Sequence, residues 1–246
     1  MKSFLFIMAL VLFFSCTKES GNSADAANSG SGTGGSLAKF TIAGNSLYLV
    51  DDISLKVFNI SNPANAVLRN TVSLRFGVET IYSYKDKLFI GSRDGMYIYS
   101  VADPDVPVLL GEARHTRSCD PVVANDSFAF VTLRGNQPCG PAEDGLYIYN
   151  IKNLLVPSLV NKHLMPTPHG LGIRDSILYV CQKDNGMSIF NISNPASPVL
   201  RRKIADKVFE DVICYGDLLI CYVSTGLALY DISNATDPVS ISVVNN

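Results

Sequence analysis

The sequence lacks the features that mark nucleic-acid-binding proteins and the familiar catalytic motifs. Its 20 Lys and Arg are balanced by 22 Asp and Glu, the net charge is −2, and no basic run occurs. This balance argues against a surface that binds nucleic acid or anionic lipid by charge. There is also no glycine-rich phosphate loop, nucleophile elbow, His-x-x-x-His pair or Cys-x-x-Cys pair. No catalytic activity can therefore be assigned from a motif.

Long apolar stretches are scarce, and the one present lies at the N-terminus. Lys2 precedes an apolar stretch at residues 4–14, which is too short to span a bilayer and is typical of a signal peptide. The stretch ends in Phe13-Phe14-Ser15-Cys16, which resembles a lipobox. The resemblance implies cleavage after residues 1–15 and a lipid on the thiol of Cys16. The alternative is a secretory signal peptide that is cut elsewhere.

Residues 16–36 are rich in Gly, Ser, Asn and Ala and contain almost no large apolar residue. Such a composition cannot bury enough surface to fold, so a flexible tether is predicted. With residues 37–246 as a soluble domain, the expected location is the outer membrane or the cell surface, with the lipid as the anchor.

A sequence pattern recurs five times. Its apolar and aromatic start is followed by Asn, Asp or Ser, a polar turn, Pro and an apolar run. The copies are residues 55–68, 96–109, 146–159, 187–200 and 227–240. Their marker aromatics, Phe58, Tyr99, Tyr149, Phe190 and Tyr230, are spaced by 41, 50, 41 and 40 residues. A period near forty residues indicates a repeat architecture.

Each repeat divides into four short β segments separated by turns rich in Asp, Gly and Pro. The segments carry apolar residues on both faces, which is typical of sheets that are sandwiched between neighbours. We therefore predict an all-β fold, a five-bladed β-propeller with four antiparallel strands per blade. The absence of Trp excludes the WD type of repeat. A β-solenoid is the alternative fold.

Residues 146–150 (LYIYN) and 227–233 (LALYDIS) resemble the LVIVD repeat of bacterial surface and exported proteins. Residues 118–123, 168–172 and 211–213 are similar to the later blades of that family. The resemblance extends over the whole folded part and implies a β-propeller lipoprotein. It implies no established catalytic activity.

The third repeat is longer than the others, and the excess lies in residues 134–144. Cys119 and Cys139 flank the first two strands of this blade, so both are expected at the same end of the hairpin. In an exported protein we predict a disulfide between them, with free thiols as the alternative. Cys181, Cys214 and Cys221 lie in apolar segments and are expected to be small buried residues.

Counting back from the second strand of each repeat selects Lys39, Thr80, Asp120, His169 and Glu210, with Asp211 as a neighbour. In a propeller these residues would surround one mouth of the central channel. They could line the channel as paired polar groups, bind a ligand or a divalent cation, or act as acid and base in glycoside cleavage. Nearby carboxylates are expected to raise the pKa of His169 and to have lowered pKa values themselves.

The leading hypothesis is a lipid-anchored cell-envelope module that binds or scaffolds a protein or glycan partner without turnover. It requires no cofactor, although a divalent cation is possible. The alternative is a hydrolase or lyase, similar to a glycosidase, with its site at the channel mouth.

Overall fold

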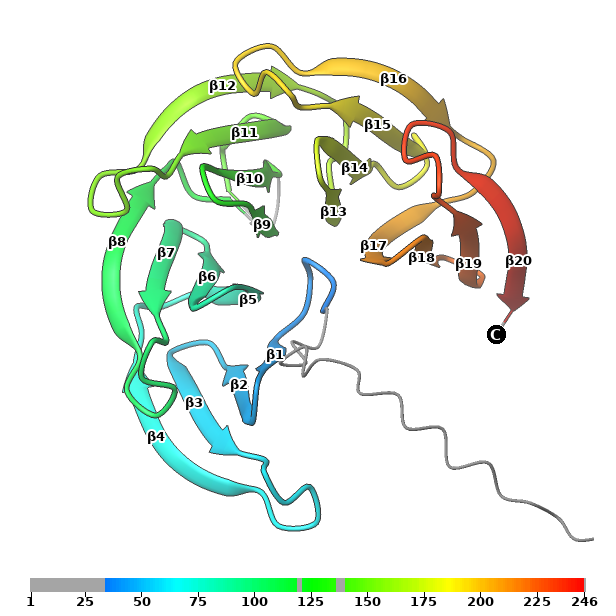
Figure 1. Ribbon diagram of the computed structural model, residues 1–246. Helices are drawn as coiled ribbons and strands as arrows, with labels where there is room; N and C mark the ends of the chain where they lie inside the picture. Colours follow the sequence, from blue (N-terminus) through cyan, green and yellow to red (C-terminus); the bar gives the residue numbers. More distant parts are fainter. Residues whose placement is uncertain (1–33, 119–120, 136–139, 246) are drawn as a thin grey trace, which may run out of the picture.

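The computed structural model describes residues 34–118, 121–135 and 140–245. Twenty strands form five antiparallel four-stranded sheets, and Figure 1 shows these sheets arranged in chain order around a centre. The sheets are blade 1 (β1–β4), blade 2 (β5–β8), blade 3 (β9–β12), blade 4 (β13–β16) and blade 5 (β17–β20). The predicted five-bladed β-propeller is confirmed.

The strands follow the repeat period closely. They are β1 Phe40–Ala43, β2 Ser46–Val50, β3 Ser54–Asn59, β4 Val67–Ser73, β5 Val78–Tyr84, β6 Lys87–Ser92, β7 Gly95–Ser100, β8 Val108–Arg114, β9 Val122–Ala124, β10 Phe128–Leu133, β11 Gly145–Asn150, β12 Ser158–Leu164, β13 Leu171–Arg174, β14 Ile177–Cys181, β15 Met187–Asn191, β16 Val199–Ile204, β17 Phe209–Tyr215, β18 Leu218–Val223, β19 Gly226–Asp231 and β20 Val239–Asn245. The first strand of each blade is innermost and the fourth is outermost (Figure 1).

The polar residue that ends the third strand of each blade makes the same contact every time. In blade 4, Asn191 Oδ1 accepts a hydrogen bond from the Ser193 amide, and Asn194 Oδ1 accepts one from the Ala196 amide. The other blades repeat the first contact through Asn59, Ser100, Asn150 and Asp231. These side chains replace backbone partners at the turn, which explains why Asn, Asp and Ser interchange there.

The marker aromatic of each repeat lies at a β-bulge. The register between the third and fourth strands shifts at Phe58, Tyr99, Tyr149, Phe190 and Tyr230. A bulge bends its strand and increases the local twist. The recurring aromatic thus coincides with the point at which the outer strand curves around the ring.

The core consists of the apolar faces at which neighbouring blades meet. Blades 4 and 5 share one cluster of buried side chains, which includes Tyr179 and Tyr230, and blades 2 and 3 share another, which includes Phe89 and Tyr149. Cys181 and Cys221 are buried, as predicted, and Cys214 is half-buried. No helix in the described part of the chain is long and apolar enough to cross a membrane.

A short segment at residues 34–38 precedes β1 and enters the centre of the ring (Figure 1). Ser36 is 1% exposed, and its hydroxyl accepts a hydrogen bond from the Leu171 amide of blade 4. The Ile81 amide of blade 2 donates to the carbonyl of Ala38. The segment therefore fills part of the central channel and contacts blades on both sides of it.

Candidate functional site

The residues predicted at the channel mouth are only partly brought together. Lys39 directly precedes β1 and is exposed, whereas Thr80 lies within β5 and is 3% exposed. His169 precedes β13, and Glu210 lies in β17. Three further predictions lie outside the described residues: Asp120 at the channel mouth, lipidation at Cys16, and the disulfide between Cys119 and Cys139.

The strand register corrects the count that selected these residues. Thr80 pairs with Gly91 of β6, and the residue in the same position of blade 5 is Asp211, which pairs with Tyr222. Backbone hydrogen bonds put Lys39, Pro121 and Gly170 in this position in the other blades. In blades 3, 4 and 5 the predicted residue therefore lies one position before the residue that occupies the ring position. Glu210 is an extra residue at a β-bulge, and Glu79 occupies the same bulge in blade 2.

His169 is the centre of a charged cluster contributed by three blades. Its ring is 7% exposed, and Arg134 Nη1 of blade 3 lies 2.5 Å from His169 Nε2. On the other side, Nδ1 lies 3.5 Å from Glu210 Oε2 of blade 5. Lys183 Nζ lies 3.7 Å from the same Glu210 oxygen. Two cations and one carboxylate thus surround the imidazole.

These surroundings hold His169 neutral. Burial lowers the pKa of His169 to about 3, and the positive charges of Arg134 and Lys183 act in the same direction. With Arg134 donating to Nε2, the ring proton is on Nδ1 and points toward Glu210. The predicted rise in the pKa of His169 is wrong, because burial and the charges of Arg134 and Lys183 outweigh the effect of Glu210.

Asp211 holds the segment that enters the channel. Its Oδ1 accepts a hydrogen bond from Ser36 Oγ at 3.0 Å, and its Oδ2 accepts one from the Leu37 amide at 3.2 Å. The Val212 amide also donates to Oδ1. Burial raises the pKa of Asp211 to about 6, although all three donors favour the ionised form. The expected lowering of the carboxylate pKa values is therefore wrong for Asp211.

The described residues give the possible divalent cation little support. Among them, no group of three or more His, Cys, Asp or Glu side chains is placed to hold a metal ion. His169 and Glu210 form a pair, and Asp211 is occupied by Ser36 and Leu37. This geometry suits a set of mutually paired polar groups at the channel mouth.

A second concave site lies at the rim of the ring, between blades 2 and 3. It is a cleft of about 490 Å³ lined by Glu112, Ala113, Arg114, His115 and Thr116 of blade 2 and by Leu133, Pro141, Ala142, Glu143, Tyr147, Tyr149, Pro157, Leu159 and Lys162 of blade 3. Volumes of this order are typical of ligand sites. Apolar side chains, two tyrosines and charges of both signs meet there.

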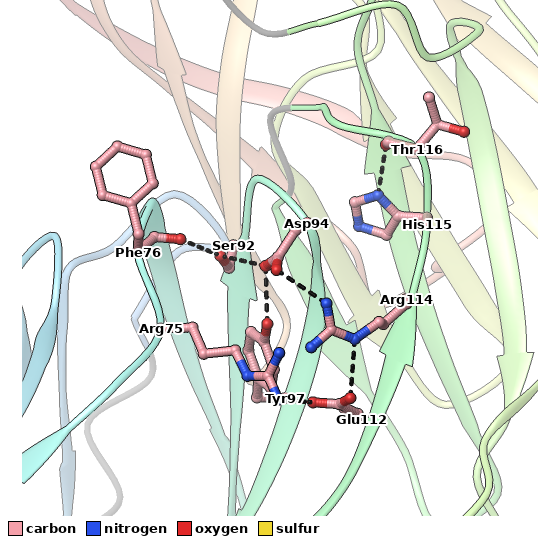
Figure 2. Close-up of polar contacts among 9 residues, drawn as sticks. All are labelled: Arg75, Phe76, Ser92, Asp94, Tyr97, Glu112, Arg114, His115 and Thr116. Atoms are coloured by element: carbon pink, nitrogen blue, oxygen red, sulfur yellow. Dashed lines mark hydrogen bonds and ion pairs between the residues drawn. The ribbon is translucent and has the colours of Figure 1, made fainter.

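The blade 2 side of the cleft is fixed by a network of ion pairs and hydrogen bonds (Figure 2). Asp94 accepts hydrogen bonds from Ser92, Tyr97 and Arg114 at 2.8–3.2 Å. The Nε of Arg114 also donates to Glu112 at 2.9 Å. Because Arg114 joins both carboxylates, its side chain and that of Glu112 are held in position at the edge of the cleft.

The blade 3 side is built by the extra residues of the third repeat. Glu143 forms an ion pair with Lys162, whose ammonium lies 5.5 Å from the centre of the Tyr147 ring. The Glu143 carboxylate holds the pKa of Lys162 above its usual value. Ala142 and Glu143 also line a second, more open hollow beside Asp144, Leu164, Met165 and Pro166. The extra residues of the third repeat thus line both the cleft and the neighbouring hollow.

Sequence reasoning missed Arg134, Lys183 and the cleft. The available signal was the length of the third repeat, since Arg134 begins the excess and Pro141, Ala142 and Glu143 belong to it. An insertion in one copy of a repeat is commonly part of a binding face.

The chain matches the family model of the LVIVD repeat at residues 34–73 and 173–206, which are the first blade and most of the fourth. No curated protein matches the chain in sequence.

Several solved structures share the fold at low sequence identity. A functionally unknown protein from Desulfotomaculum acetoxidans superimposes with a TM-score of 0.64 at 12% identity, over 82% of this chain and 66% of that one. A protein from Lactobacillus plantarum gives 0.61 at 13% identity, over 82% and 68%. Apo AztD from Citrobacter koseri gives 0.56 at 13% identity, over 84% and 64%. The chain thus spans about two thirds of the length of these structures. The two matched regions are LVIVD repeats, and the chain forms a five-bladed β-propeller.

Proposed function

We propose that the protein is a lipid-anchored cell-envelope module that binds a protein or glycan partner in the cleft between blades 2 and 3. The observation that carries the proposal is the insertion in the third repeat. The other blades follow the repeat closely, whereas Pro141, Ala142 and Glu143 depart from it and line a cleft of about 490 Å³. Residues outside the common pattern of a repeat protein are not required to build the ring, so a recognition role is a reason for their presence.

The chemistry of the cleft suits an extended polar polymer. Arg114 and Lys162 provide N–H donors, and Glu112 and Glu143 provide acceptors. Tyr147 adds a flat apolar surface on which a sugar ring or a peptide side chain can pack. These groups are paired with one another in the structure, so a partner would exchange some of these contacts for its own.

Binding can be tested with a chain that carries Cys16→Ser, so that it can be purified without the lipid. Arg114→Glu and Lys162→Glu reverse the two positive charges of the cleft, and Arg201→Glu reverses an exposed charge on β16 as a matched control. Envelope proteins captured by the parent chain and by Arg201→Glu should be lost in both cleft variants. An array of envelope oligosaccharides, probed with the same four chains, tests the glycan. Equal capture by all four chains would refute the proposal that the partner binds in the cleft.

The anchor is tested separately, because it is independent of the cleft. Cys16→Ser should move the protein from the membrane fraction to the soluble fraction without lowering its melting temperature. Part of the predicted tether, residues 34–36, is held in the channel, but Cys16 lies outside the described residues and its substitution leaves Ser36 and its contacts unchanged, so folding is not expected to change. A variant that stays in the membrane fraction after a high-salt wash would refute lipid anchoring.

The alternative function is a hydrolase or lyase at the channel mouth. The observation in its favour is the approach of His169 Nδ1 to within 3.5 Å of Glu210 Oε2. Two observations favour channel lining instead, since the imidazole is buried and Arg134 occupies its second nitrogen. Hydrolysis of a panel of glycosides that is lost in Glu210→Gln and kept in Arg114→Glu would support the enzyme and replace the binding proposal.

A further inference from the structure

A small cavity lies between blades 2 and 3, at the end of the ring opposite the channel mouth. The mouth is at the start of the innermost strands, whereas this cavity is at the turns that follow them. Its volume is about 100 Å³, and it is lined by Tyr84, Lys85, Lys87, Asn125, Asp126, Ile151, Lys152 and Leu154. The described linings of this cavity and of the cleft have no residue in common, so the cavity is a separate site.

The walls of the cavity are fixed by the core and by a closed turn. Ile151 is 2% exposed, and Tyr84 and Leu154 pack against the cluster of buried side chains that blades 2 and 3 share. Asn125 Oδ1 accepts hydrogen bonds from the amides of the two residues at the start of β10, which closes the turn of blade 3. These contacts hold the walls without a ligand, so the cavity is preformed.

The charges around the cavity are mostly positive. Lys85, Lys87 and Lys152 provide three ammonium groups, and Asp126 is the one carboxylate among the described lining residues. Lys85 forms an ion pair with Asp126, and Lys87 Nζ lies 2.5 Å from Asp86 Oδ1, outside the lining. The exposed ammonium of Lys152 has no hydrogen-bond or ion-pair partner among the described residues. The cavity therefore has a positive surplus, although the net charge of the chain is −2.

All three lysines depart from the other copies of the repeat. A backbone hydrogen bond that recurs in every blade, such as the one from the Ile151 amide to the Ser127 carbonyl, identifies the equivalent positions. The residues equivalent to Lys85 are Gly44, Asp126, Asp175 and Gly216, those equivalent to Lys87 are Ser46, Phe128, Ile177 and Leu218, and those equivalent to Lys152 are Ser61, Ala102, Ser193 and Ser233. None of these residues is Lys or Arg. The repeat does not require the lysines, yet they meet at one cavity.

Lys85 is also held in a backbone conformation that disfavours its side chain. Its φ is +53°, in the left-handed region, and Gly44 and Gly216 have φ values of +58° and +55° at the same position. Glycine adopts this conformation without the steric cost that a Cβ brings. Folding of the turn alone would therefore favour Gly, and the charge of Lys85 is a reason for its presence.

We propose that this cavity binds a phosphate or another tetrahedral oxyanion, either free in solution or carried on a lipid headgroup. The charged oxygens of such a group point in several directions, and here they would meet ammonium groups contributed by two blades. Lys binds phosphate as a point charge. A cavity of about 150 Å³ holds benzene, so a cavity of about 100 Å³ suits a smaller group. The apolar floor strengthens the attraction between the anion and the ammonium groups, because it lowers the local dielectric constant.

The first test is calorimetric titration of inorganic phosphate and of sulfate into the Cys16→Ser chain, in chloride buffer at constant ionic strength. Lys85→Gly, Lys87→Ser and Lys152→Ser each introduce a residue that another blade has at the same position, so the fold should be kept, and the melting temperature checks this. Each should weaken binding about tenfold, the loss expected for one charge-assisted hydrogen bond. Lys203→Ser removes an exposed positive charge of β16 and is the matched control, which should bind as the parent chain does.

A second test distinguishes the two sources of the anion. The same chains are floated with phosphatidylcholine vesicles that contain or lack phosphatidic acid, whose headgroup is a phosphate monoester. Binding that requires phosphatidic acid, and that is lost in Lys152→Ser but kept in Lys203→Ser, would support the site and assign it to a lipid headgroup. Binding of inorganic phosphate without a preference among vesicles would support the site and assign it to a free anion.

Two outcomes would overturn the proposal. If neither anion gives heat and phosphatidic acid does not increase flotation, the three lysines are only a solvated face. If binding is equally strong in the parent chain and all three lysine variants, or is lost in Lys203→Ser, the anion binds elsewhere. Neither outcome affects the proposed function, because Arg114 and Lys162 of the cleft lie outside this cavity.

Discussion

Four of the five junctions between neighbouring blades, the closed junctions, are filled by apolar side chains of the blades themselves, whereas at the fifth, the open junction, the contacts are hydrogen bonds from residues 36 and 37 to Asp211. Between blades 4 and 5 the junction contains Tyr179, Ile189 and Tyr230, all at most 3% exposed. Between blades 5 and 1 the equivalent positions are half-buried, and the contacts run from Asp211 to Ser36 and Leu37. The same repeat thus makes two different kinds of junction.

The difference shows what the repeat alone determines. Each copy specifies a sheet with two apolar faces, but a face is buried only where another sheet meets it. In repeat proteins, stability is approximately a sum of repeat and nearest-neighbour terms. Blade 5 has one neighbouring sheet instead of two, so we expect its local stability to be lower than that of blades 2–4.

The largest expected effect comes from equivalent substitutions at a closed and an open junction. Ile189 and Leu229 occupy the same position of the third strand in blades 4 and 5. Ile189→Ala removes a fully buried side chain and should cost about 2–5 kcal/mol of unfolding free energy. Leu229→Ala removes a half-buried one and should cost less than about 2 kcal/mol. Urea denaturation of both variants measures the difference, and equal losses would mean that the fifth junction is closed in solution.

The next effect is the pH dependence that Asp211 gives to the stability of the open junction. The pKa of Asp211 is raised from 3.8 to about 6 by folding, so the native state binds the proton more tightly than the unfolded chain. The stability from this group is present below pH 3.8 and is lost as the pH rises to about 6, by at most about 3 kcal/mol. Asp211→Asn should remove this slope, so the variant should gain stability relative to wild type between pH 4 and 7.

His169 also makes the free energy of unfolding depend on pH, and its contribution has the opposite sign. Its pKa is lowered from 6.5 to about 3, so its contribution is present above pH 6.5 and is lost as the pH falls. The difference between wild type and Asp211→Asn cancels the His169 contribution, because both chains contain His169. Urea denaturation at pH 4, 5, 6 and 7 provides the curves. Parallel curves would show that Asp211 titrates normally.

The fold was predictable because the same signals recur in every copy. Apolar residues on both faces indicated stacked sheets, and the period near forty residues fixed the number of blades. The open junction was not predictable, since Ile220 and Leu229 are as apolar as Phe130 and Ile148. Burial depends on what lies opposite a face, and this information is absent from the repeat itself.

The channel mouth was predicted less well, for a local reason. The count began at the first apolar residue of each second strand, and in blades 3–5 this residue (Phe128, Ile177 or Leu218) lies one position earlier in the strand than Leu47 and Leu88 do in blades 1 and 2. The contacts of His169 with Arg134 and Glu210 join three blades, and no pattern within one repeat reveals them. The prediction of a ligand or cation at this mouth stays a prediction, since Asp120 lies outside the described residues.

A smaller effect is expected where the N-terminal segment crosses the open junction. Ser36→Ala removes the donor to Asp211 and leaves the buried Leu171 amide without its acceptor. An unsatisfied buried donor costs about 1–3 kcal/mol, so the melting temperature should fall. Ser158→Ala, at an exposed serine of β12, is the control and should have no measurable effect. An unchanged melting temperature in Ser36→Ala would show that the segment does not stabilise blade 5.

The smallest effect tests whether the closed junctions are equivalent to one another. Tyr48 and Tyr179 occupy the same position in blades 1 and 4, and each donates a hydrogen bond to a carbonyl of the next blade, at 3.1 and 2.7 Å. Replacement by Phe keeps the ring packed and removes only this bond, so each variant should lose about 1 kcal/mol of unfolding free energy. The double variant should lose the sum, because sites in separate junctions share no partner. A loss in the double variant well above the sum would mean that the two junctions are coupled through the ring, and the nearest-neighbour description of this propeller would then be inadequate.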